Sequence, residues 1–82
     1  MGYIEFVARL PEKKGMLGTR EIAKAVKAGT VKRVIAASNC PEELLAKVRG
    51  EYVVIERFEG DSKQLGTKLG KPFSVAMVGY EN

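Results

Sequence analysis

Residues 15–29 read GMLGTREIAKAVKAG, and this stretch decides how the rest of the 82-residue chain is organised. A turn at Gly18-Thr19 leads from a short apolar pair into a helix of about Thr19–Ala28, which ends at Gly29. At 100° per residue, the cationic side chains gather on one side of this helix and the apolar ones on the other. The cations are Arg20, Lys24 and Lys27, and the apolar residues are Ile22, Ala23, Ala25 and Val26.

The basic side of this helix has two interpretations. A helix N-terminus presents unpaired N–H groups and the positive end of the helix dipole, and with the three cations it suits a polyanion. A charged outer face is also the ordinary solvent-exposed side of an amphipathic helix, which is the commoner case. The helix alone leaves both interpretations open.

Strands and helices alternate on either side of this stretch. Apolar and β-branched runs predict strands at residues 14–17, 31–37, 52–58 and 73–78. Helices are expected between them, at residues 19–28, 41–50 and 61–70. This spacing predicts an α/β fold, a three-layer α/β/α sandwich around a small mixed four-stranded sheet. A chain of this length is expected to form a single domain over residues 1–82.

Several residues indicate where the helices begin and end. Pro41 suits the first helical position, with two glutamates in the first turn after it. Asp61 and Gln64 have the spacing of a capping box. Gly66 lies within the predicted third helix, where it permits close packing against another segment.

The N-terminal run Tyr3–Leu10, YIEFVARL, is ambiguous. Its apolar residues alternate as in a strand, but several of them also fit one stripe of a helix. We expect a short helix that ends at Pro11, followed by a PEKKG turn.

Composition narrows the possible functions. The net charge of +4 favours nucleic acid or an acidic surface as partner. Histidine is absent, which removes the usual general base and the usual metal ligand, so we expect neither an enzyme nor a metal site. The lone Cys40 fits a reducing cytosol. No apolar run could span a bilayer and no secretory signal is present, so we expect a cytoplasmic protein without a membrane partner.

Three short segments stand at equivalent ends of the predicted elements: Gly18–Lys24, Ser38–Pro41 and Gly70–Phe73. A three-layer fold could gather them on one rim, with cations for phosphates, polar side chains for base edges and Phe73 as an aromatic face. Each of these side chains also suits a purely structural role. Phe73 equally fits core packing at the start of a strand, Asn39 is more often a turn or cap residue, and Cys40 suits a small buried position.

Two long runs resemble a known family: GTREIAKAVKAGTVKRVIAASNCP at residues 18–41 and FEGDSKQLGTKLGKPFSVAMV at residues 58–78. They are similar to the ribosomal kink-turn-binding superfamily, which includes L-seven-Ae and L-thirty-e. The resemblance covers about Gly15 to Val78. The run from Phe58 to Pro72 is most similar to archaeal L-thirty-e.

The resemblance implies an α/β/α sandwich that binds sharply kinked RNA through three segments. The first strand–helix turn corresponds to Gly18, Thr19, Arg20, Glu21 and Lys24. The loop after the second strand corresponds to Ser38, Asn39, Cys40 and Pro41, and the loop before the last strand to Lys71, Pro72 and Phe73. Phe73 then takes the place of an aromatic residue that packs on RNA. Lys27 joins these residues as a further phosphate contact from the basic side of the helix.

The chain departs from the L-seven-Ae branch in two places. Arg20 stands where that branch has an asparagine, which puts recognition of tandem sheared G·A pairs in that manner in doubt, although arginine suits a phosphate or a guanine edge. Lys-Pro-Phe at residues 71–73 replaces an aliphatic trio. Both departures favour the L-thirty-e branch.

The sequence therefore predicts a kink-turn RNA-binding protein, a structural component of the large ribosomal subunit. We expect it to be ribosome-associated, monomeric when free, without a cofactor, and in contact with other ribonucleoprotein components. Two alternatives stay open. One is a non-ribosomal kink-turn binder, in a guide-RNA modification particle or in ribonuclease P. The other is a protein-interaction module of the same fold that has lost RNA binding. A carboxylate-based hydrolase is remote.

Overall fold

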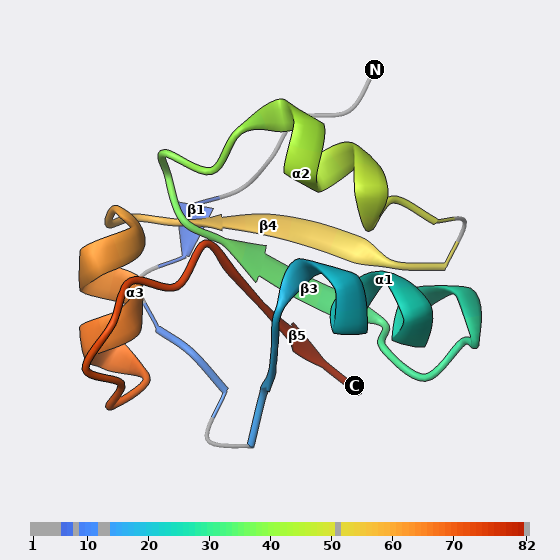
Figure 1. The fold of residues 1–82 in the computed structure, drawn as a ribbon, viewed down its shortest axis with the longest axis horizontal. Helices are drawn as coiled ribbons and strands as arrows, with labels where there is room; N and C mark the ends of the chain where they lie inside the picture. Colours follow the sequence, from blue (N-terminus) through green and yellow to red (C-terminus); the bar gives the residue numbers. More distant parts are fainter. Residues whose placement is uncertain (1–5, 8, 12–13, 51, 82) are drawn as a thin grey trace.

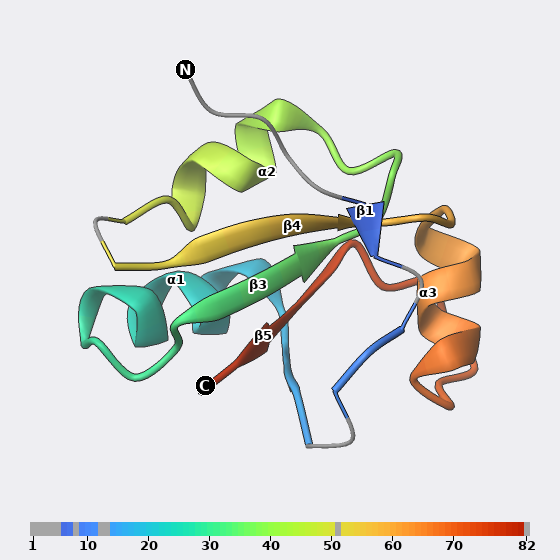
Figure 2. The same ribbon diagram turned by 180° about the vertical axis from the view of Figure 1, so that it is seen from behind.

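The computed structural model describes residues 6–7, 9–11, 14–50 and 52–81. Strands and helices follow one another along the chain as shown in Figures 1 and 2. In chain order they are β1 (Phe6–Val7), β2 (Met16–Leu17), α1 (Thr19–Lys27), β3 (Arg33–Ala36), α2 (Glu42–Lys47), β4 (Val54–Phe58), α3 (Ser62–Lys68) and β5 (Met77–Tyr80).

The strands form one mixed sheet in the order β1-β4-β3-β5-β2. β3 lies parallel to β4, with Val34 opposite Ile55, and antiparallel to β5, with Ile35 opposite Val78. β2 is antiparallel to β5, and β1 is parallel to β4. The predicted α/β class with a mixed sheet is confirmed.

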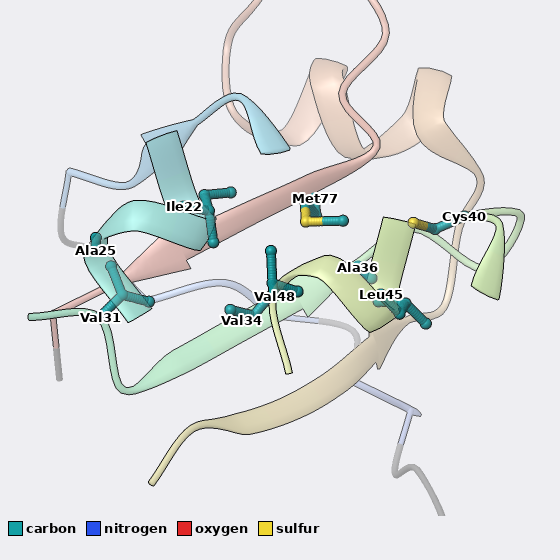
Figure 3. Packing of buried hydrophobic residues seen from close by; sticks show 9 residues of the cluster. All are labelled: Ile22, Ala25, Val31, Val34, Ala36, Cys40, Leu45, Val48 and Met77. Carbon is teal, nitrogen blue, oxygen red and sulfur yellow. The ribbon is translucent and has the colours of Figure 1, made fainter. Parts of the chain in front are cut away.

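Helices cover both faces of the sheet. On one face, α1 and α2 contribute Ile22 and Leu45 to a buried cluster that also holds Val34 and Met77 from the strands (Figure 3). On the other face, α3 contributes Leu65, which is buried with Ile35 and other strand residues. Alternate residues of β3 thus point to opposite layers, as a strand buried on both faces requires. The predicted three-layer arrangement is confirmed.

The expected helix within Tyr3–Leu10 is wrong at Phe6 and Val7, which form β1. The two residues pair with Arg57 and Phe58 and add a fifth strand to the four predicted. Pairing along the free side of β4 is a tertiary contact, and it decided between two patterns that fitted the local sequence equally well. The remainder of the expected helix at residues 3–5 and 8, and residues 12–13 of the expected turn, lie outside the described residues.

Some element bounds differ from the prediction. Pro41 is the residue before α2 rather than its first residue, and α2 ends at Lys47, before Gly50. β4 begins at Val54 and not at Tyr52. β5 begins at Met77 and not at Phe73, because the chain up to Val75 lies against α3: Val75 N–H donates to the carbonyl of Ser62 over 3.0 Å.

The helix starts follow the local sequence. Gly18 precedes α1 with φ of 95°, a conformation that favours glycine, and its carbonyl accepts the first helical hydrogen bond from Ile22 over 2.9 Å. The predicted capping box of α3 is complete. Asp61 Oδ1 accepts from Gln64 N–H and Gln64 Oε1 accepts from Asp61 N–H, each over 2.9 Å. None of the helices in the described part of the chain is long and apolar enough to cross a membrane.

Candidate nucleic-acid interface

The sheet topology gathers the three predicted segments on one edge. β2, β3 and β4 run in the same direction and β5 runs against them, so the ends of the first three strands meet the start of β5. Gly18–Lys24 follows β2, Ser38–Pro41 follows β3, and Lys71–Phe73 lies shortly before β5 (Figure 1). We call this side of the sheet the carboxyl edge.

The first segment presents the open start of α1. Within the described residues no side chain caps this helix, so the N–H groups of its first turn are not occupied by a capping side chain. Arg20, Glu21 and Lys24 are exposed, while Thr19 is half-buried. Ile22 is fully buried in the cluster beneath, which fixes the orientation of the helix on the sheet. The segment therefore offers backbone donors and two cations next to each other.

Lys27 lies apart from the carboxyl edge. It belongs to the last turn of α1, about 12 Å from the first residue of the helix at 1.5 Å per residue. Its neighbours there are Lys47 and Arg49, at and beyond the end of α2. Lys27 thus lines the same hollow as Thr19 and Arg20, but the structure does not bring it to the second and third predicted segments.

The second segment is joined to α3 through Asn39. Its side-chain oxygen accepts a hydrogen bond from Ser62 N–H over 3.0 Å, and Ser38 N–H donates to the Gly60 carbonyl over 2.9 Å. Asn39 therefore acts as a cap, one of the two roles that the sequence left open. Asn39 is nevertheless exposed, and this bond uses only its side-chain oxygen and not its amide NH₂ group.

Cys40 is a packing residue, as its sequence context suggested. Its side chain is buried in the cluster beneath α2. Burial raises the pKa of the Cys40 thiol, an effect that the Arg57 guanidinium opposes and Glu42 reinforces. A thiol with a raised pKa stays protonated at neutral pH and is a poor nucleophile or metal ligand. Among the described residues, no group of three His, Cys, Asp or Glu side chains could hold a metal ion.

Arg57 holds the second segment in place, and sequence reasoning missed it. One nitrogen of its guanidinium, Nη1, donates to the carbonyls of Ala37 (2.9 Å), Ser38 (3.3 Å) and Cys40 (3.0 Å). A second nitrogen, Nη2, lies 3.2 Å from Glu42 Oε1. These bonds are possible because Arg57 stands opposite Ala36 in the parallel β3–β4 register. The sequence held an indication of this role, because an arginine inside the apolar strand run YVVIERF needs polar partners at the end of that strand.

The third segment presents Phe73 on a firmly held backbone. Phe73 is 56% exposed, so a core-packing role is wrong. Lys71 and Pro72 beside it are also exposed. Lys71 N–H donates to the Gly66 carbonyl over 2.9 Å. Gly66 has no side chain, and a Cβ there would overlap the backbone carbonyl oxygen of Phe73. The absence of a side chain in α3 thus allows the loop to lie directly against the helix.

The whole chain resembles proteins of one family. A family model described as "Ribosomal protein L7Ae/L30e/S12e/Gadd45 family" matches residues 5–82. The chain belongs to this family.

Individual members of the L7Ae/L30e family are similar over most of the chain. "Large ribosomal subunit protein eL30" of Archaeoglobus fulgidus is 45% identical over 62 residues, which cover 76% of this chain and 72% of that protein. The protein of the same name from Methanosarcina mazei is 38% identical, over 79% of this chain and 63% of its own length. The chain thus spans about two thirds of the length of these relatives.

A solved structure, of a Bacillus halodurans protein with unknown function, matches this fold. Its TM-score is 0.66 at 28% identity, over 83% of this chain and 71% of that one. The resemblance to the L7Ae/L30e family that the two long sequence runs indicated is therefore confirmed, both by the family model and by relatives named eL30.

Proposed function

We propose that this member of the L7Ae/L30e family binds kink-turn RNA as a structural component of the large ribosomal subunit. Two of its relatives carry the name of a large-subunit protein, eL30. The observation that carries the proposal is the exposed Phe73, whose loop leads to the start of β5 at the edge of the sheet that also holds the open start of α1 and the exposed Asn39. This edge combines a stacking surface, charge and polar groups, as RNA recognition needs.

In this proposal, three groups of residues contact the phosphates, the base edges and a base face of the RNA. Arg20, Lys24 and Lys71 neutralise phosphates that a sharp bend brings close together, and the N–H groups at Gly18 and Thr19 add donors for a phosphate oxygen. Glu21 and Asn39 orient exposed bases through hydrogen bonds. Phe73 stacks on an unpaired base, with Lys71 and Pro72 fixing its loop. Ser38 shares the exposed loop of Asn39.

We further propose that residues 1–82 act as one RNA-binding domain, monomeric when free and located in the cytoplasm on ribosomes with other ribonucleoprotein components. No catalysis or cofactor is needed, because recognition of a bent RNA requires only contacts to phosphates, base edges and base faces. Lys27 contributes to binding from outside the carboxyl edge.

Titration with two RNAs tests the proposal. A labelled kink-turn RNA and an unkinked duplex of equal length are compared at two salt concentrations, and we expect tighter binding of the kink-turn at both. Equal weak binding of the two RNAs would contradict specific recognition. No binding of either RNA would favour a protein-interaction module of the same fold. Cross-linking in cell extract, followed by sequencing of the bound RNA, then separates ribosomal RNA from a guide RNA or ribonuclease P RNA.

Replacing Phe73 by alanine is expected to cost about 1–3 kcal/mol of kink-turn affinity, because one stacked base loses its partner. The ring is exposed, so the melting temperature should change little. Phe73→Tyr is the matched control, since it keeps a flat ring and should keep the affinity. A lower melting temperature with unchanged RNA affinity would mean that Phe73 serves the fold and not the RNA.

A further inference from the structure

A hollow of about 620 Å³ lies between α1 and α2 and extends from the start of α1 at the carboxyl edge toward the last turn of that helix. The two helices lie side by side on the same face of the sheet (Figures 1 and 2). Of the described residues that line the hollow, four are cationic and none is acidic. The lining residues are Thr19, Arg20, Ala23, Lys27, Ala46, Lys47 and Arg49.

A second hollow, of about 680 Å³, continues from the first. The two share Lys27 and Arg49, and the second adds Lys32 and the exposed Tyr52. The described residues that line it again include no carboxylate. The joined hollows, which we call the α1–α2 groove, therefore run from Arg20 at the carboxyl edge to the far ends of both helices.

The cations of the groove have no acidic partners in the described part of the chain. The ion pairs found there are Arg33 with Glu56 and Arg57 with Glu42, and neither involves a groove residue. Charge is also divided along α2: its two glutamates are in the first turn, at the carboxyl edge, and Lys47 is in the last. Like charges gathered along one concave surface create a positive potential that attracts a polyanion.

The groove has the dimensions and position for an RNA backbone. Arg20 and Lys27 are about 10 Å apart along α1, which corresponds to about three nucleotides of one duplex strand. The groove begins at Arg20, which the proposed function already assigns to phosphate binding. An RNA held at the carboxyl edge can therefore continue directly into the groove. Its cations are all exposed and line an open hollow, which suits an extended polyanionic backbone better than a small enclosed ligand.

We infer that the α1–α2 groove binds the phosphate backbone of an RNA arm that extends away from the carboxyl edge. This inference rests on the proposed function, because the arm is part of the RNA held there. Lys27, Lys47 and Arg49 then form a second, sequence-independent set of phosphate contacts. They raise affinity and orient the arm without discriminating among bases.

The test uses the full chain and two forms of one kink-turn RNA, with arms extended in the first and trimmed to the kink in the second. Wild-type protein binds the extended RNA more tightly. The double variant K47Q/R49Q binds the extended RNA only as tightly as the wild type binds the trimmed one. For the extended RNA, the slope of log affinity against log salt concentration becomes shallower by about 1.5 in this variant, since two phosphate contacts are lost.

The matched control is K63Q/K68Q, which removes two exposed cations from α3 on the opposite face of the sheet. It leaves both affinities unchanged. Equal losses in the two double variants, or an unchanged affinity of K47Q/R49Q for the extended RNA, would overturn the inference. If the wild type does not prefer the kink-turn, the proposed function is wrong. Binding of the unkinked duplex then still tests whether the groove contacts RNA phosphates. There, a shallower salt slope in K47Q/R49Q alone supports the groove, and equal slopes reject it.

Discussion

Gly66→Ala is expected to lower the free energy of unfolding by about 3 kcal/mol, near the upper end for an added methyl in a packed region. Alanine is the better helix former by about 1 kcal/mol, so propensity alone would stabilise α3. The added Cβ, however, would overlap the carbonyl oxygen of Phe73, which is backbone and cannot rotate away. Relief requires moving the loop that precedes β5. Thermal and urea unfolding measure the change.

The same substitution reports on the loop that displays Phe73. Displacing this loop should also weaken kink-turn binding, since the ring then leaves the carboxyl edge. Lys63→Ala is the matched control, because it changes an exposed residue of the same helix and should alter stability by less than about 0.5 kcal/mol. A Gly66→Ala protein as stable as the wild type would show that the loop can retreat from α3 at no cost.

Arg57→Met is expected to cost about 2 kcal/mol of stability, because a part-buried carbonyl that loses its donor, here that of Cys40, costs about 1–3 kcal/mol. The Ser38 contact is exposed and the Ala37 carbonyl keeps a hydrogen bond from Cys40 N–H, so these two add little. The methionine keeps the apolar stem but removes the donor shared by the carbonyls of Ala37, Ser38 and Cys40. It also removes the pairing with Glu42, but that partner is largely exposed, so this part contributes little. Hydrogen exchange of the backbone N–H groups in residues 38–40 should become faster.

Arg33→Met separates the loss of loop contacts from the loss of a half-buried charge. Arg33 stands on the neighbouring strand β3, and its side-chain partner among the described residues is Glu56 and not a carbonyl of the 38–40 loop. We expect this control to leave exchange in residues 38–40 unchanged. If both variants loosen the loop equally, the three carbonyl contacts of Arg57 are not what holds it.

Local signals predicted much of the fold because their causes lie within a few residues. The period of α1 and the Asp61–Gln64 capping box each involve contacts no more than a turn apart. The two layers over the sheet also followed from the alternation of strands and helices, and the structure confirms them. β1 could not be predicted this way, because Phe6 and Val7 become a strand only by pairing with β4, about fifty residues later.

The candidate interface likewise has features that the sequence predicted and features that it did not. The residue types and the three segments of the carboxyl edge were readable in the sequence, and the family resemblance placed them together. Three details were not readable: the bond between Asn39 and Ser62, the hold of Arg57 on the second segment, and the exposure of Phe73. Each depends on a partner that is distant in the chain and is brought close by strand register or helix docking.

By itself, then, the sequence determined the α/β class, the start and end of α1, and the identity of the cations and the aromatic ring available for RNA. Only the tertiary structure decided which of these side chains are exposed and which of them lie close together. Phe73 is exposed because Gly66 lets its loop dock on α3 instead of joining the sheet, and Lys27 faces the α1–α2 groove because α2 lies beside it. Exposure and proximity are properties of packed elements, and no local pattern carries them.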